Sequence, residues 1–149
     1  METVRSEVER RLRSLVDRDD VAATVAFLRN HDEATLATQI RITEIPAPPF
    51  QEGRRAAALA ALLEEAGLTE VTTDDVGNVV AHRGGMSSGD RPLVVSAHLD
   101  TVFPAGTDVT VRRDGPLLEG PGISDDGRGL AVRDIRAEAQ YGDGRDHHA

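Results

Sequence analysis

The spacing of the hydrophobic residues changes at Gly67, and this change restricts the fold more than any other feature of the sequence. Before Gly67, apolar residues recur at every third or fourth position, which is typical of amphipathic helices. After it, they alternate with polar residues or form short runs bounded by Gly, Asn and Asp, which is typical of strands and turns. We therefore predict an α/β fold in which N-terminal helices are followed by part of a mixed sheet that is left incomplete.

The individual elements follow from these patterns and from the residues that end them. Pro46, Pro48 and Pro49 stop the third predicted helix, and Gly67 ends the fourth. The helices are predicted over residues 2–16, 20–28, 32–44 and 52–66. The strands are predicted over residues 70–73, 79–82 and 92–98, with a hairpin formed by 109–111 and 117–119. The third strand is almost continuously apolar, so we expect it to be buried on both faces.

The composition excludes several classes of function. The chain has no Cys, and all 17 of its basic residues are Arg, so thiolate zinc sites, Cys nucleophiles, Lys Schiff bases and P-loops are excluded. A net charge of −9 and an aromatic content of 3% argue against nucleic-acid partners. No apolar run approaches the about 18 residues of a membrane span and no secretory signal is visible, so we expect a cytoplasmic protein without a membrane partner.

Two short motifs carry the residues suited to metal chemistry. His98 and Asp100 follow the apolar run, and side chains two apart on an extended strand point the same way. In one arrangement His98 binds a metal ion and Asp100 orients the imidazole through its second nitrogen. In the other, both side chains bind the metal ion. Asp125 and Asp126 follow in a Gly-rich turn, 25 residues after Asp100. A carboxylate at position 125 could bridge two metal ions about 3.5–4 Å apart.

The two motifs together resemble the di-zinc exopeptidase superfamily, which includes aminoacylases, peptidase T, carboxypeptidase G and succinyl-diaminopimelate desuccinylase. The resemblance is carried by residues 96–104 and 120–131, is supported upstream by 43–49, 64–68 and 75–80, and covers about 43–132. It implies that His98 is a ligand of one metal ion, that Asp125 is the bridging carboxylate, and that Asp100 is a catalytic-site residue that orients His98. It also implies two zinc ions, with cobalt or manganese as alternatives, and hydrolysis of peptide or N-acyl amino acid substrates.

The sequence departs from that superfamily after Asp125. The resemblance implies a later pair of adjacent Glu residues, one of them the general base, together with further ligands and a dimerisation domain; no such Glu pair follows Asp125. We therefore expect a helical segment over 1–42, the N-terminal part of a metallopeptidase catalytic domain over 43–132, and a disordered or aberrant tail over 133–149. On this interpretation the chain is an inactive fragment of an enzyme that forms a homodimer when complete.

A second hypothesis belongs to a different class. The chain would be a non-catalytic binding or interaction module, in which helices between residues 2 and 44 dock to a partner and the carboxylates bind metal only weakly. Zinc titration separates the two hypotheses: tight binding of two ions that is lost in Asp125→Ala would favour an intact site, and binding weaker than about 1 mM would favour the module or a broken fragment.

Overall fold

The computed structural model describes residues 4–83 and 94–131, which divide between Glu33 and Ala34 into two compact units. The first unit contains helices α1 (Val4–Val16) and α2 (Asp19–Asn30), which confirms the first two predicted helices over the described residues. Neither helix buries a side chain within the described structure. Most of their large hydrophobic side chains are exposed, although Val21 and Phe27 are partly buried, and charged pairs such as Arg11 and Glu7 line α1.

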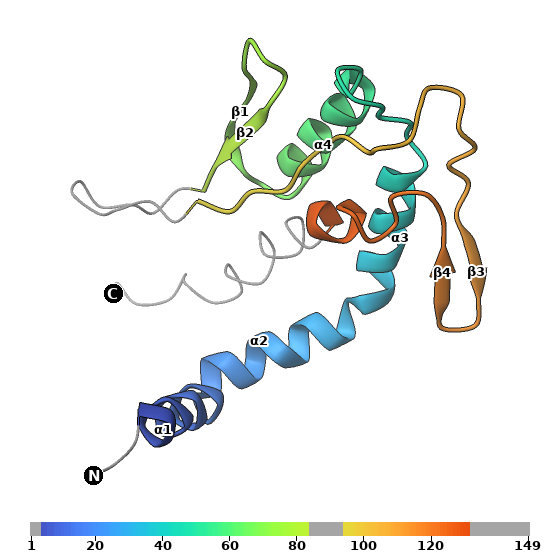
Figure 1. Ribbon diagram of the computed structural model, residues 1–149. Coiled ribbons are helices and arrows are strands. Elements are labelled where there is room, and N and C mark those ends of the chain that lie inside the picture. Colours follow the sequence, from blue (N-terminus) through green and yellow to red (C-terminus); the bar gives the residue numbers. More distant parts are fainter. Residues whose placement is uncertain (1–3, 84–93, 132–149) are drawn as a thin grey trace. The chain divides into compact units, whose positions relative to one another are not determined.

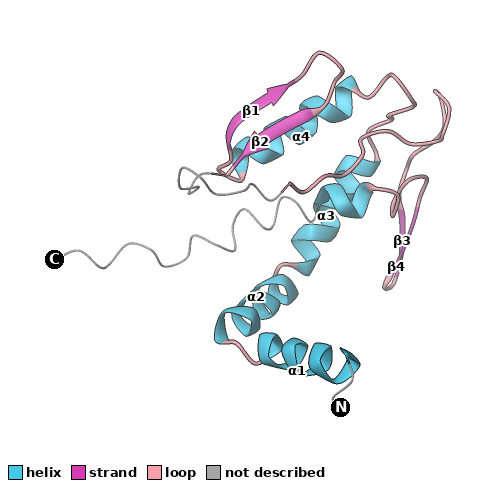
Figure 2. Cartoon of the chain, turned by 60° about the vertical axis from the view of Figure 1, so that its left-hand side comes forward, coloured by secondary structure: helices cyan, strands magenta, loops and turns pink. Residues whose placement is uncertain are grey.

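The second unit begins within helix α3 (Asp32–Thr43) and continues through helix α4 (Gly53–Glu65). Strands β1 (Thr69–Thr73) and β2 (Val79–His82) form an antiparallel hairpin that lies against α4, as Figures 1 and 2 show. Strands β3 (Arg112–Asp114) and β4 (Leu117–Glu119) form a second antiparallel pair. The predicted α/β class is confirmed: helices precede two small two-stranded sheets, and no sheet closes within the described part of the chain.

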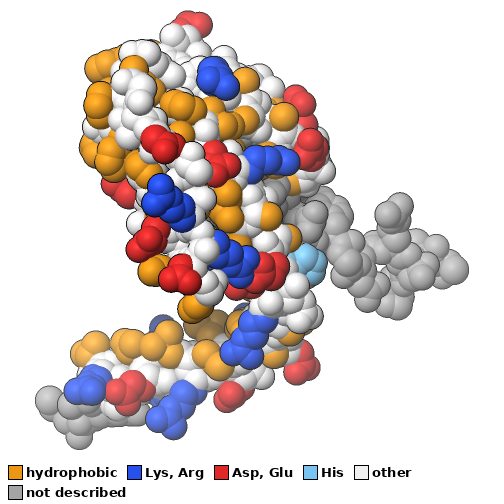
Figure 3. All heavy atoms as spheres, turned by 90° about the vertical axis from the view of Figure 1, so that its right-hand side faces the viewer, with side chains coloured by type: hydrophobic (Ala, Val, Ile, Leu, Met, Phe, Trp, Pro, Cys, Tyr) orange, Lys and Arg blue, Asp and Glu red, His pale blue; other side chains and the backbone are white. Residues whose placement is uncertain are grey.

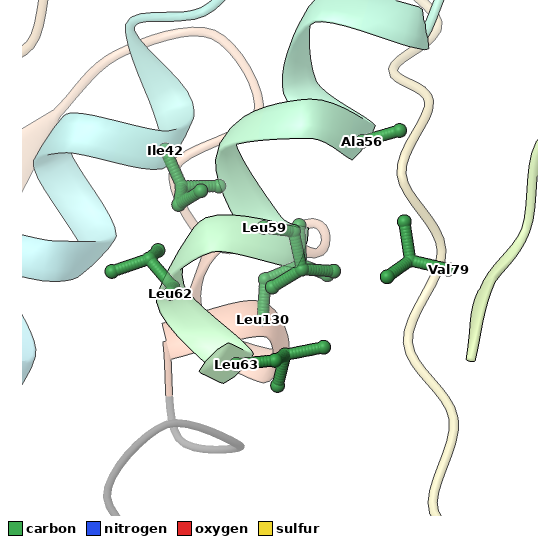
Figure 4. Packing of buried hydrophobic residues seen from close by; sticks show 7 residues of the cluster. All are labelled: Ile42, Ala56, Leu59, Leu62, Leu63, Val79 and Leu130. Atoms are coloured by element: carbon green, nitrogen blue, oxygen red, sulfur yellow. The ribbon is translucent and has the colours of Figure 1, made fainter. Parts of the chain in front are cut away.

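Helix α4 provides most of the hydrophobic core. Leu59, Leu62 and Leu63 lie three and four positions apart, so they share one face of the helix, and all three are buried. Their partners come from α3, from β2 and from the helical residues 127–131, as Figure 4 shows with Ile42, Val79 and Leu130. The core therefore joins segments that are far apart in the sequence.

Gly67 ends α4 as the sequence predicted. It adopts a φ of +76°, where a side chain would be strained. The amide of Leu68 donates to the carbonyl of Leu63 at 3.0 Å, and the amide of Gly67 donates to that of Glu64 at 2.9 Å. These two hydrogen bonds form a Schellman motif, which satisfies carbonyls that the last helical turn leaves without partners.

The strand predicted over 92–98 is wrong in its described part. Residues 94–98 pair with no strand of the described chain, and the side chains of Val94 and Val95 are 80% and 45% exposed. A strand becomes buried on both faces only when neighbouring strands and covering helices surround it. The described residues supply no such neighbours for this segment. Residues 92 and 93 lie outside the described residues.

The predicted hairpin is present, but its first strand begins three residues later. Gly115 and Pro116 form a two-residue turn that pairs Asp114 with Leu117. A turn of this length sets the register of both strands, so β3 covers Arg112–Asp114 instead of 109–111. Val109 is instead buried, outside the ladder.

Two further expectations bear on the chain as a whole. The tail expected over 133–149 lies outside the described residues, and the segment boundaries at 42/43 and 132/133 stay predictions. Among residues 4–83 and 94–131, no helix has the length and apolar character needed to cross a membrane.

We predict that Leu59→Ala lowers the free energy of unfolding by about 2–5 kcal/mol, because it removes buried methyl groups from the centre of the core. Leu117→Ala is the matched control, since that side chain is 54% exposed, and we expect it to change stability by less than about 0.5 kcal/mol. Urea unfolding followed by circular dichroism measures both. Equal effects of the two substitutions would show that the core is not where the structure places it.

Candidate functional site

His98 lies on an extended segment that runs along the hydrophobic core. Its neighbours Ala97 and Leu99 are partly buried and pack against the core. Because successive side chains of an extended backbone point to opposite sides, their inward orientation turns His98 and Asp100 outward. The side chains of His98 and Asp100 are accordingly about half exposed, at 47% and 45%.

Asp125 lies in the turn that precedes the helical residues 127–131. Leu130 and Ala131 are buried and attach this segment to the core. Asp126, joined to Asp125 by a cis peptide bond, accepts a hydrogen bond from the amide of Gly129 at 3.1 Å. Asp126 thus acts as an N-terminal cap, while the side chain of Asp125 remains 81% exposed.

The structure brings the three predicted site residues together. The Nε2 atom of His98 lies 3.0 Å from Oδ1 of Asp125. On the other side of the ring, Nδ1 of His98 lies 2.9 Å from the backbone carbonyl oxygen of Asp100 and 3.2 Å from its Oδ1. One imidazole therefore lies between two carboxylates, each on its own ring nitrogen.

These contacts determine where the protons of His98 lie. A carbonyl oxygen only accepts hydrogen bonds, so Nδ1 must carry a proton and donate it toward Asp100. The lone pair of Nε2 then faces an oxygen of Asp125, and the two repel each other unless a cation lies between them. A proton on Nε2 removes this repulsion, and accordingly the hydrogen bond with Asp125 raises the pKa of His98; burial of the ring opposes this, and Asp100 adds to the increase.

The same pair of atoms suits a divalent metal ion. Two ligands held at about 2.0–2.1 Å from a tetrahedral zinc ion lie about 3.3 Å apart, close to the distance that separates Nε2 from Oδ1. Imidazole nitrogen and carboxylate oxygen are also common zinc ligands. Within residues 4–83 and 94–131, however, no group of three or more His, Asp and Glu side chains is arranged to hold a metal ion. The described residues thus bring one imidazole nitrogen and one carboxylate oxygen to a separation that suits a metal ion, without completing a set of ligands.

A buried glutamine supports the turn that carries Asp125, and the sequence analysis missed it. Gln39 donates from Nε2 to the carbonyl of Ile123 at 2.6 Å, and its Oε1 accepts from Arg128 at 3.2 Å. Gln39 lies four residues after Thr35 and three before Ile42, so it occupies the buried face of α3. A polar residue at such a position is the signal that could have identified it, because a buried amide needs partners.

The turn also lies close to the end of α3. A methyl group built on Gly127 would lie 2.5 Å from Oγ1 of Thr43 and 3.0 Å from the carbonyl oxygen of Gly122. Thr43 is fully buried. Only glycine fits at position 127 without moving the backbone that presents Asp125.

One comparison with known proteins found a match over the segment that carries these residues. Residues 78–133 match the family model of peptidase family M28, which belongs to the zinc exopeptidases. The match includes His98, Asp100 and Asp125 and covers less than half of the chain. No curated protein matches the chain. The likeness to aminoacylases, peptidase T, carboxypeptidase G and the desuccinylase remains a resemblance of motifs.

We predict that Gly127→Ala lowers the free energy of unfolding by about 1–3 kcal/mol, because the new methyl group collides with Thr43 and Gly122. Gly53→Ala is the matched control: nothing lies within 4 Å of its new methyl group, so we expect an unchanged or slightly higher stability. Thermal unfolding of both variants measures the difference.

A second variant tests the cause of that loss. Adding Thr43→Ala to Gly127→Ala removes the hydroxyl that the methyl group meets, so the double variant should lose less stability than the two single changes together. Strict additivity of the two losses would contradict the close contact.

Proposed function

We propose that residues 94–131 form part of the metal site of a metal-dependent peptidase. In this proposal His98 is a ligand of one zinc ion, and Asp125 is the carboxylate shared by two ions. The observation that carries the proposal is the 3.0 Å separation of His98 Nε2 and Asp125 Oδ1, with the opposite ring nitrogen already held by Asp100. The match of residues 78–133 to peptidase family M28 supports it.

Asp100 is assigned the role of orienting His98. Its backbone carbonyl and its carboxylate both lie within hydrogen-bond distance of Nδ1. These contacts orient the imidazole so that its other nitrogen, Nε2, faces Asp125. A carboxylate in this position also increases the basicity of the ring and so its affinity for a metal ion.

The chemistry proposed for the site is hydrolysis of an amide bond. Zinc, or cobalt or manganese in its place, supplies a Lewis acid for the carbonyl of a peptide or an N-acyl amino acid and lowers the pKa of water. The protein's part is to hold His98 and Asp125 at the right spacing on backbone that the core fixes. A general base must then accept a proton, and no adjacent Glu pair follows Asp125 to provide one.

A second candidate, the interaction module, is favoured by a different observation. The exposed hydrophobic residues of α1 and α2 include Val8, Leu12 and Leu15, and Figure 3 shows hydrophobic side chains at the surface of these helices. Exposed apolar residues gathered on a helix are common at docking surfaces. This candidate requires no affinity for zinc.

We predict that the chain binds zinc and that His98→Ala or Asp125→Ala abolishes the binding, because each removes a ligand. Asp100→Asn should weaken it by about 10–100-fold through the loss of an orienting partner. Isothermal titration calorimetry measures these affinities in a chain that carries His147→Ala and His148→Ala, since adjacent His residues bind metals by themselves.

His82→Ala is the matched control for this titration. His82 lies at the end of β2, where its Nε2 atom is 4.0 Å from a carboxylate oxygen of Glu70. Zinc affinity that falls equally in the His82→Ala and His98→Ala variants would refute the proposed site, as would an affinity weaker than about 1 mM in the parent chain.

The zinc affinity should decrease with falling pH. Zinc needs the unprotonated Nε2, and the hydrogen bond with Asp125 raises the pKa of His98 above its ordinary 6.5. Protons therefore begin to compete at a pH above 6.5, and each pH unit below the raised pKa should cost about tenfold in affinity for one displaced proton. Titrations from about pH 5.5 to about 8.5 check this, and an affinity that does not vary with pH would contradict it.

We predict that the zinc-loaded chain does not hydrolyse dipeptides or N-acetyl amino acids faster than the His98→Ala variant does. Without the general base, hydrolysis should be slower by at least about 10²–10⁴-fold than in a complete site. Chromatography of the released amino acid measures the rate. Efficient zinc-stimulated cleavage that disappears in His98→Ala would show that the chain is an active peptidase.

A further inference from the structure

Arg55 is a buried cation directly beneath the proposed metal site. It lies in the first turns of α4 and is only 1% exposed. Its Nη1 donates to the carbonyl of Leu99 at 2.8 Å, and its Nε and Nη2 donate to the carbonyl of Ile45 at 3.0 and 2.6 Å. A further hydrogen bond joins Nη2 to the carbonyl of Thr43 at 3.2 Å.

The partners of Arg55 belong to both halves of the site. Leu99 stands between His98 and Asp100, so its carbonyl fixes the backbone that presents both side chains. Thr43 ends α3, and its side chain meets the turn of Asp125 at Gly127. One guanidinium therefore ties the segment that carries the imidazole to the helix end that supports the carboxylate.

Burying a guanidinium to satisfy backbone carbonyls costs free energy, and this points to a role of Arg55 beyond stability. Among the described residues, no carboxylate accepts a hydrogen bond from Arg55, although Asp100 is near enough to favour its charged form. Burial of a charge costs several kcal/mol unless good hydrogen bonds compensate it, and an apolar side chain of similar volume is often no less stable. The guanidinium of Arg55 presents five N–H donors in a planar fork and reaches three carbonyls, whereas the ammonium of lysine is a compact charge with three donors on one atom.

We propose that Arg55 is a positioning residue: it sets the distance between His98 and Asp125 by holding Leu99 and the end of α3 together. The functional meaning of this role rests on the proposed metal site. The positioning itself is a property of the metal-free chain, so the two can fail separately.

The first experiment measures backbone order without metal. Nuclear magnetic resonance relaxation of residues 98–100 is compared among the parent chain, Arg55→Met, Arg55→Lys and the control Arg54→Met, whose arginine is exposed on the same helix. We expect the order of residues 98–100 to fall in both Arg55 variants and to stay unchanged in Arg54→Met. An unchanged order in a folded Arg55→Met variant would overturn the proposal.

The second experiment relates positioning to metal binding. We expect Arg55→Met to lose at least about tenfold in zinc affinity, and Arg55→Lys to recover only part of it. Arg54→Met, which changes an exposed arginine of the same helix, should keep its affinity within about threefold. If the parent chain binds no zinc while residues 98–100 still lose order, the proposed function fails and the positioning role of Arg55 holds.

A third measurement uses the unaltered chain, in case the Arg55 variants do not fold. The Nε–H proton of Arg55 should exchange with solvent at least about tenfold more slowly than that of Arg54, because its hydrogen bond to Ile45 is buried. Equal exchange rates would show that the buried hydrogen bonds of Arg55 are not formed, and would overturn the proposal.

Discussion

The structure of the second unit depends on burying one face of α4. Leu59, Leu62 and Leu63 form that face, and each of the other segments of the unit's core packs on it through a few hydrophobic side chains. Leu99 and Leu130 are the two contacts that matter for the site, because they fix the segments of His98 and Asp125 on the same core. Hydrophobic packing thus positions polar side chains that have little stabilising interaction of their own.

The proposed site combines exposed side chains with buried, hydrogen-bonded residues beneath them. His98, Asp100 and Asp125 are all accessible to solvent, so their mutual hydrogen bonds contribute little to stability. Beneath them, Arg55 and Gln39 are buried and donate to backbone carbonyls next to the site residues. Exposed side chains supported by buried hydrogen bonds suit the proposed metal site, because the spacing of its ligands must persist when the ion leaves.

The elements that local interactions determine were predictable, and those that need distant partners were not. The apolar periodicity of α4 and the cap at Gly67 depend on residues only a few positions apart. The sequence therefore predicted both the helix and the residue at which it ends. The apolar run at 92–98 was predicted to be a buried strand, but a strand requires neighbours that periodicity does not supply. The shift of the hairpin to Arg112 follows from a two-residue turn whose effect on register is likewise not local.

For the site, the sequence by itself determined which residues have the right chemistry. The spacing of His98 and Asp100 on an extended backbone and the glycines around Asp125 were visible in it. Only the tertiary structure decided that Nε2 of His98 and Oδ1 of Asp125 lie 3.0 Å apart, and that Arg55 donates to the carbonyl of Leu99 beside His98. The physical reason is that these contacts join residues 27 to 44 positions apart, and a shared hydrophobic core, which no local pattern records, brings them together.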